Sequence, residues 1–133
     1  VIMAKGWVKT FKVRQQRIRK EGSQYFTWQV PAMAPSAEEF IQVNESFPAA
    51  KKYAPLDWLE IVNNEDAINV TLQVNGQDSF SCPAGTIRTL TDTALWQLVV
   101  TNTHAGDTTT LNLITITLRR SPDTVDKWLR RNE

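Results

Sequence analysis

The stretch "INVTLQVNG", residues 68–76, shows the clearest secondary-structure signal in this chain of 133 residues. Apolar and polar residues alternate along it, the apolar ones being Ile68, Val70, Leu72 and Val74. A period of two places each set on one face of a strand, so we expect a half-buried strand here. Asn75-Gly76 is a typical hairpin turn, and "SFSC" beyond it continues the alternation with Phe80 and Cys82 on one face.

Further strands are predicted on both sides of this hairpin. They are residues 24–30 ("QYFTWQV"), 56–62 ("LDWLEIV"), 87–90 ("IRTL"), 94–102 ("ALWQLVVTN") and 111–120 ("LNLITITLRR"). The polar "NNEDA" favours a hairpin that joins 56–62 to 68–74. Short strands separated by turns at intervals of roughly ten residues are typical of a sandwich or barrel. We therefore predict an all-β protein, with residues 21–120 forming an antiparallel β-sandwich.

The segment between Pro31 and Pro55 is less regular. "SAEEFIQV" fits a short helix or a strand, and "NESFPAAKKYAP" has the prolines of a long loop. A long connection in a small sandwich often crosses from one sheet to the other, so we expect a crossing here.

Both chain ends are predicted to extend the sandwich. Residues 1–20 form a basic N-terminal arm, read as a strand near 7–19 that makes a hairpin with 24–30, because Phe11 and Val13 alternate with Lys12 and Arg14. Residues 121–133 form a short amphipathic helix with Ser121 as its N-cap. Such a short helix needs a surface to dock on.

Composition excludes several classes of protein. Cys82 is the only cysteine and His104 the only histidine, so an intrachain disulfide and a multi-histidine metal site are both excluded. No apolar run approaches the roughly 20 residues of a membrane span, and the N-terminal residues lack the apolar h-region expected of a signal peptide. Catalytic and phosphate-binding motifs are absent, and His104 reads as an exposed residue at a hairpin tip. We expect no enzyme activity, no cofactor and no metal.

Charge is unevenly distributed although the net charge is only +1. Residues 1–20 carry seven basic and no acidic residues, whereas residues 21–78 carry nine acids against two lysines. Such segregation concerns association rather than fold. A contact with another protein subunit, a solvated face, and nucleic-acid binding through residues 5–20 all fit the basic arm. A subunit contact is favoured, because the acid-rich block offers a partner for the charge.

Five tryptophans supply further candidates. Trp58 and Trp96 are candidate stacking platforms for a carbohydrate, whereas Trp7 and Trp128 read as anchors at the chain ends. The predicted interface residues combine basic side chains, which set register and association rate, with aromatic and apolar ones, which supply buried area. They are Trp7, Lys9, Lys12, Arg14, Arg17, Arg19, Trp128, Leu129 and Arg130.

Residues 59–120 resemble small virion proteins of bacteriophages and archaeal viruses. The matching positions are 61–63 and 68–76, strands that end in Asn and in Asn-Gly, then "PAGT" at 83–86 and a strand closing on "V-x-N" at 98–102. The resemblance implies a jelly-roll-like sandwich that acts as a capsid or capsid-decoration subunit. It also implies that the protein is made in a host cytoplasm and resides in the virion, with copies of itself, as a trimer for example, and other capsid proteins as partners. Carbohydrate binding and nucleic-acid binding are the alternatives.

Overall fold

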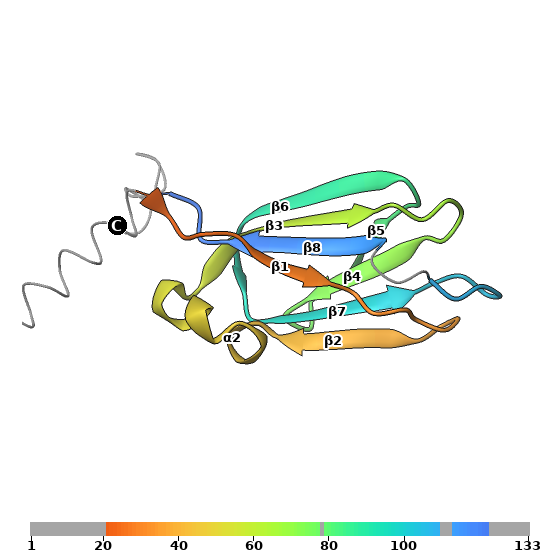
Figure 1. The fold of residues 1–133 in the computed structure, drawn as a ribbon, viewed down its shortest axis with the longest axis horizontal. Helices are drawn as coiled ribbons and strands as arrows, with labels where there is room; N and C mark the ends of the chain where they lie inside the picture. Colours follow the sequence, from red (N-terminus) through yellow and green to blue (C-terminus); the bar gives the residue numbers. More distant parts are fainter. Residues whose placement is uncertain (1–20, 78, 110–112, 123–133) are drawn as a thin grey trace, which may run out of the picture.

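The protein is an all-β sandwich, and its structure, a computed structural model, describes residues 21–77, 79–109 and 113–122. Two four-stranded sheets face each other, with strand orders β1-β8-β3-β6 and β2-β7-β4-β5 (Figure 1). All neighbouring strands are antiparallel. The strands are β1 (Phe26–Gln29), β2 (Glu38–Gln42), β3 (Leu56–Asn63), β4 (Val70–Val74), β5 (Ser79–Cys82), β6 (Thr86–Leu95), β7 (Gln97–Asn102) and β8 (Ile114–Arg119). The predicted antiparallel sandwich is confirmed.

The core lies between the sheets and follows the predicted alternation. Every second side chain of β3, β4, β7 and β8 points inward and is buried. Among these are Leu59, Ile61, Leu72, Leu98, Val100, Ile116 and Leu118. Burying this apolar surface is the main favourable term for a fold that has no disulfide.

The hairpin predicted at Asn75-Gly76 is confirmed. Both residues have positive φ angles, 56° and 71°, and the amide of Gln77 donates to the carbonyl of Val74 at 3.0 Å. Positive φ at both central positions is the type I′ geometry, which matches the twist of paired strands. The turn therefore joins β4 and β5 within one sheet.

The hairpin predicted between residues 56–62 and 68–74 is wrong. β3 pairs with β6 and β8, whereas β4 pairs with β5 and β7 in the other sheet. The buried side chain of Asn63 fixes this corner, because its Nδ2 donates to the carbonyls of Ile68 at 2.9 Å and Cys82 at 3.0 Å. The polar linker thus turns the chain from one sheet into the other.

The boundary between the strands predicted at 87–90 and 94–102 is also corrected. β6 continues to Leu95, and the chain changes sheets at Trp96 rather than near residue 92. Asp92 has a φ of 55°, and the register of β6 on β3 shifts between Leu56 and Trp58. The polar residues at 91–93 therefore form an irregularity within one strand and do not end it.

The segment 36–55 contains a strand and two short helices. Of the two readings of "SAEEFIQV", the strand is observed as β2; it is followed by α2 (Val43–Ser46) and the 3-10 helix η1 (Pro48–Tyr53). Pro48 occupies the start of η1, where its missing N–H costs no hydrogen bond. This connection runs from β2 in one sheet to β3 in the other, which confirms the predicted crossing.

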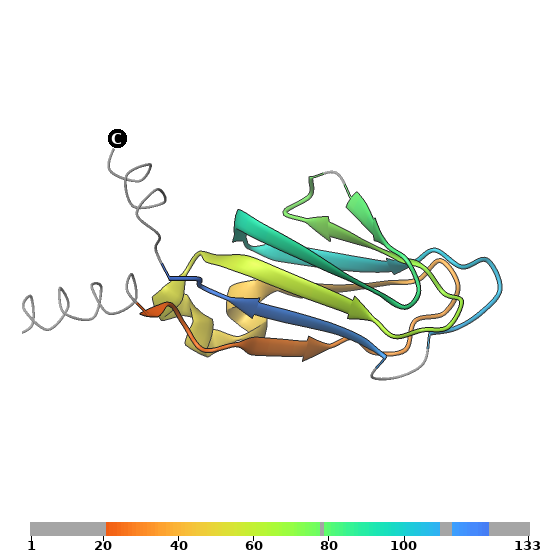
Figure 2. The same cartoon turned by 90° about the horizontal axis from the view of Figure 1, so that it is seen from above.

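The sandwich has two ends that differ in what they hold. Residues 30–37, 64–69, 83–85 and 103–109 gather at one end, which we call the loop end (Figures 1 and 2). At the other, the terminal end, lie α2, η1, the β4–β5 turn and the places where the chain enters β1 and leaves β8. The predicted arm of residues 1–20, its hairpin with 24–30, and the helix after Pro122 lie outside the described residues. β1 itself pairs with β8.

Candidate functional site

The terminal end brings the two ends of the described chain together. The amide of Ser23 donates to the carbonyl of Arg120 at 2.8 Å, and the amide of Arg120 donates to the Ser23 hydroxyl at the same distance. Gly22 has a φ of 74°, and a side chain there would collide with the Arg120 carbonyl. Glycine is therefore required where the chain enters the sandwich. The entry and exit segments are fixed to each other by backbone geometry.

A second set of bonds ties the exit segment to β3 and η1. The Arg120 guanidinium donates to the carbonyls of Tyr53 at 3.4 Å and Pro55 at 3.2 Å. The buried carboxylate of Asp57 accepts from the amide of Ser121 at 2.8 Å and from its hydroxyl at 2.9 Å. Ser121, predicted as a helix N-cap, here binds a neighbouring strand. The direction in which the chain leaves is thus set by the sandwich.

Trp58, one of the two predicted platforms, is half-buried beside an exposed tyrosine. Its ring meets Tyr25 edge-to-face with centroids 5.8 Å apart, and the Arg119 guanidinium lies over the Tyr25 ring at 4.9 Å. Arg119 also donates to the Tyr25 hydroxyl at 3.1 Å and to the Glu21 carbonyl at 3.4 Å. Trp58 does share the outer face of β3 with Glu60, as its sequence pattern predicts. The exposed ring of this cluster is Tyr25, which is 58% exposed.

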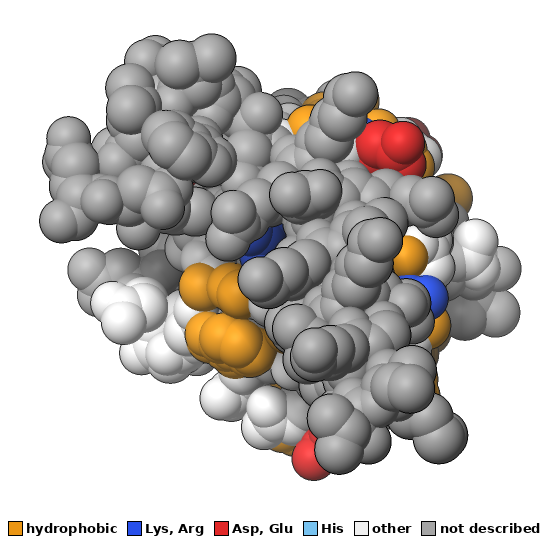
Figure 3. Space-filling model, turned by 90° about the vertical axis from the view of Figure 1, so that its left-hand side faces the viewer, with side chains coloured by type: hydrophobic (Ala, Val, Ile, Leu, Met, Phe, Trp, Pro, Cys, Tyr) orange, Lys and Arg blue, Asp and Glu red, His pale blue; other side chains and the backbone are white. Residues whose placement is uncertain are grey.

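Trp96, the other predicted platform, lies at the crossover between β6 and β7 and is 45% exposed. Its backbone is firmly held: its amide donates to Asn75 Oδ1 at 2.8 Å, and its carbonyl accepts from Val43 at 2.9 Å. Figure 3 looks onto the terminal end and shows hydrophobic side chains on the surface beside a few charged ones. Trp58 lies within β3, whereas Trp96 lies between the end of β6 and the start of β7, so the two predicted platforms stand on different elements.

The predicted interface residues lie outside the described residues. They are Trp7, Lys9, Lys12, Arg14, Arg17 and Arg19 in the arm, and Trp128, Leu129 and Arg130 in the C-terminal helix. The nucleic-acid alternative rests on residues 5–20 and therefore stays a prediction. Sequence reasoning did not find the junction between Ser23, Asp57 and Arg120, since these residues are far apart in the chain and are joined only by the strand order.

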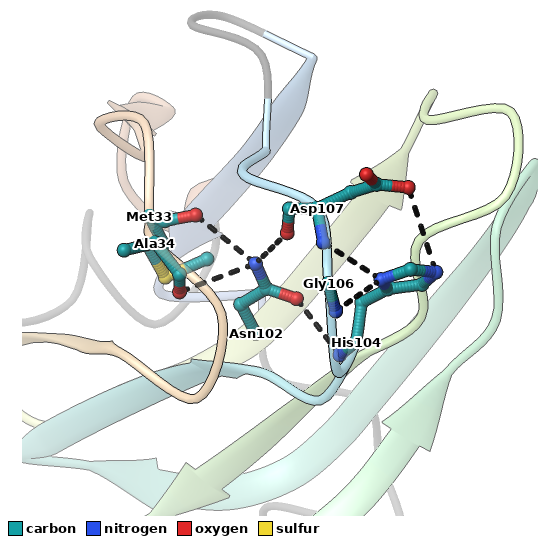
Figure 4. Close-up of polar contacts among 6 residues, drawn as sticks. All are labelled: Met33, Ala34, Asn102, His104, Gly106 and Asp107. Carbon is teal, nitrogen blue, oxygen red and sulfur yellow. Dashed lines mark hydrogen bonds and ion pairs between the residues drawn. The ribbon is translucent and has the colours of Figure 1, made fainter.

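The loop end is organised around the buried side chain of Asn102 (Figure 4). Its Nδ2 donates to the carbonyls of Met33 at 3.0 Å and Asp107 at 2.9 Å, and more weakly to the carbonyl of Ala34 at 3.3 Å. Its Oδ1 accepts from the amide of His104 at 2.9 Å. One neutral side chain thus joins the β1–β2 and β7–β8 loops. The recurring Asn at a strand end was the visible sequence signal for this corner.

His104 is part of the loop's own structure. Its Nδ1 accepts from the amides of Gly106 at 3.0 Å and Asp107 at 2.9 Å, and its Nε2 lies 3.7 Å from the Asp107 carboxylate. The hairpin predicted around His104 is wrong, because β7 and β8 belong to different sheets. His104 does lie in a loop, as predicted, with its side chain partly exposed, at 34%. With its Nδ1 lone pair used by two amides, the imidazole shapes the turn.

Within the described ranges, no three His, Cys, Asp or Glu residues are placed to hold a metal ion. The same residues include no helix of the length and apolar character that would cross a membrane. Comparison with protein-family models, with curated proteins and with solved structures found no match. The function must therefore be argued from the residues and their arrangement.

Proposed function

We propose that this chain is a non-enzymatic structural subunit of a virion, a small capsid or capsid-decoration protein. The observation that carries the proposal is the strand order, β1-β8-β3-β6 facing β2-β7-β4-β5. This order, with six of its seven connections crossing between sheets and the remaining one, from β4 to β5, forming a hairpin, supports an eight-stranded jelly-roll fold. Jelly rolls recur in viral capsid proteins and in lectins. The sequence resemblance of residues 59–120 to small virion proteins favours the first of these.

The terminal end adds a second line of support. Residues 1–20 carry seven basic residues and join the sandwich at Glu21, which lies at the terminal end. Hydrogen bonds of Ser23, Asp57 and Arg120 hold the entering and leaving segments of the chain there. A charged extension that starts from a rigid anchor is suited to reach a neighbouring subunit in a lattice. The arm, the sandwich edges and the C-terminal helix are the surfaces through which we propose that assembly occurs.

The test combines self-association with location in the native source. Sedimentation velocity of the purified full chain should show a homo-oligomer, and gold-labelled antibody against the chain should decorate particles in electron micrographs of the source. A chain that stays monomeric at its highest soluble concentration, together with label that avoids particles, would overturn the proposal. Label on particles without self-association would assign it to co-assembly with other capsid proteins.

Carbohydrate binding is the second candidate, favoured by the exposed rings of Tyr25 and Trp96, 58% and 45% exposed. Flat aromatic rings stack on sugars, and lectins share the jelly-roll architecture. A glycan array decides between the two candidates. Binding that is lost in Trp96→Ala or Tyr25→Ala, in a chain that ignores particles, would replace the structural proposal with this one.

A further inference from the structure

The open edges of the two described sheets differ in charge. β1 and β5 contain no charged residue, and β6 carries one of each sign, Arg88 and Asp92. β2 carries Glu38 and Glu39, which are the only charged residues in the four described strands of its sheet. Among the described residues neither of these two carboxylates forms an ion pair. The edge of β2 is therefore the one described edge with a net charge, and that charge is negative.

Backbone groups and an aromatic ring are also available along the edge of β2. The amide of Val43, just beyond β2, donates to the carbonyl of Trp96 at 2.9 Å. Hydrogen-bonded positions alternate along an antiparallel pair, so the N–H and C=O groups of Glu38 and Phe40 are turned away from β7 to the open edge. The Phe40 ring is 53% exposed on the outer face of the sheet, beside Val99. A strand added here would gain backbone hydrogen bonds and cover this ring.

The basic N-terminal arm complements this edge in charge and in pattern. Residues 1–20 carry seven basic residues and no acidic one, and in "KTFKVR", residues 9–14, three basic residues accompany Phe11 and Val13. We propose that residues 9–14 of one copy add as a strand to the β2 edge of a neighbouring copy. The basic side chains then meet the two carboxylates of the edge, and the apolar ones meet the exposed ring of Phe40. This inference rests on the proposed structural role, in which copies of the chain associate.

The place where the chain enters the sandwich favours a neighbouring copy over the same copy. The entry lies at the terminal end, and α2 and η1 lie between it and β2 (Figure 1). An arm that reached the β2 edge of its own copy would have to pass around both helices. In the proposed contact, residues 15–20 form the link between two copies and span at most about 20 Å. An arm of one copy on the edge of the next is a head-to-tail contact, which builds rings or lattices.

The hairpin of the arm with residues 24–30, predicted from the sequence, is the rival arrangement. It would cover the edge of β1, which offers no carboxylate to the basic arm. The two arrangements protect different backbone groups. The amide of Val30 donates to the carbonyl of Ile114 at 3.0 Å, so by the same alternation the amides of Thr27 and Gln29 are turned to the open edge of β1.

Residue-resolved hydrogen exchange of the full chain distinguishes these arrangements. At concentrations where the chain associates, the amides of Glu38 and Phe40 should be protected by at least roughly tenfold, and this protection should fall on dilution. The amides of Thr27 and Gln29 are the matched control and should exchange freely. Protection of the β1 amides, unprotected β2 amides, or β2 protection that does not depend on concentration would each overturn the proposal.

Reversal of the charges on β2 tests the role of the two carboxylates. In sedimentation equilibrium, Glu38→Lys combined with Glu39→Lys should raise the dissociation constant of the assembly by roughly tenfold, because like charges then face each other. Glu60→Lys combined with Asp66→Lys makes the same change in net charge outside β2 and should stay within about threefold of the wild type. Equal effects of the two double variants would overturn the β2 contact.

Exchange of the charges between arm and edge supplies the rescue. Adding Lys9→Glu and Lys12→Glu to the β2 double variant should recover the dissociation constant to within about threefold of the wild type. Recovery would also show that the β2 double variant is folded. Association that stays weak in the combined variant would overturn the pairing of the arm with β2.

The β2 contact and the proposed structural role fail differently. An oligomer that ignores the β2 and arm variants would leave the structural role in place and remove only the contact. A wild-type chain that stays monomeric and is absent from particles would remove both. Assembly through β2 by a chain that is absent from particles would remove the virion role and keep the contact. An arm that binds single-stranded DNA while the β2 amides stay unprotected would remove the contact and assign the arm to nucleic acid.

Discussion

The two ends of the sandwich are closed by different chemistry. At the loop end, the neutral side chains of Asn63 and Asn102 are fully buried, and each bonds through both its Nδ2 and its Oδ1 to backbone groups. At the terminal end, Arg119 and Arg120 reach partly exposed carbonyls at 3.2 to 3.4 Å. The Nε of Arg119 is buried and has no hydrogen-bond partner among the described residues.

This difference separates a structural end from an end suited to contacts. An amide side chain satisfies buried donors and acceptors without the cost of burying a charge, so it can seal a corner completely. A guanidinium keeps its charge and offers more donors than one carbonyl can use. The two corners at the loop end are thus held by the neutral side chains of Asn63 and Asn102, whereas the terminal end places two guanidinium groups where the described chain enters and leaves the sandwich.

The largest loss of stability is expected from Asn102→Ala, which tests whether the loop end depends on its buried amide side chain. The substitution removes a donor from buried carbonyls of Met33 and Asp107 and an acceptor from the His104 amide. We expect the free energy of unfolding in urea to fall by about 3 kcal/mol, since each buried group left unsatisfied costs roughly 1–3 kcal/mol. Thr101→Ala, the neighbouring outward-facing position, is the control and should cost well under half as much. Equal losses for the two variants would contradict the role given to Asn102.

A smaller effect is expected from Asp57→Ala at the terminal end. Its carboxylate accepts two hydrogen bonds from Ser121, and the side chain is buried. We expect a loss of about 2 kcal/mol, because hydrogen bonds to a charged group contribute roughly 1.5–3 kcal/mol. In hydrogen exchange, the amide of Ser121 should lose protection while that of Asn102 at the loop end keeps it. Loss of protection at both ends would mean that the ends are not independent.

Arg119→Met should have the smallest effect. The substitution keeps the aliphatic stem and removes the contact over the Tyr25 ring, which is worth about 0.5–1 kcal/mol at an exposed site. The hydrogen bonds lost to Tyr25 and Glu21 are exposed, and a buried Nε is removed at the same time. We therefore expect a loss of no more than about 1 kcal/mol in the same urea titration. A loss as large as that of Asn102→Ala would contradict the proposed difference between the loop end and the terminal end.

Alternation in the sequence predicted which residues face the core but not which strands are neighbours. The pattern of residues 68–74 gave the buried face of β4 correctly, and Asn75-Gly76 gave its turn. The false hairpin between 56–62 and 68–74 arose because a polar linker fits a turn within a sheet and a corner between sheets equally well. The side chain of Asn63 decides between them, through partners that are distant in sequence.

The candidate surfaces were predictable only in part. Exposed tryptophans are visible in a sequence, but the edge-to-face contact of Trp58 with Tyr25 depends on β8, which brings Arg119 beside Tyr25. The open edge of β2 depends likewise on the whole strand order, because an edge is defined by the absence of a neighbour in the described sheet. Alternation in the sequence therefore predicts which face of a strand is buried, whereas the strand order determines which strands are sheet edges and which distant residues meet.

The strand order also bears on how the chain folds as it is synthesised. β8, the last strand of the described residues, lies between β1 and β3 and is the only described neighbour of β1. Until β8 is available to pair, the β1-β8-β3-β6 sheet lacks an interior strand, and β1 has no described neighbour within it. Contacts this distant in sequence form slowly, and partly covered sheets are prone to aggregate. The β1-β8-β3-β6 sheet therefore depends on the last described strand for its completion, whereas all four strands of the facing sheet precede β8 in the sequence.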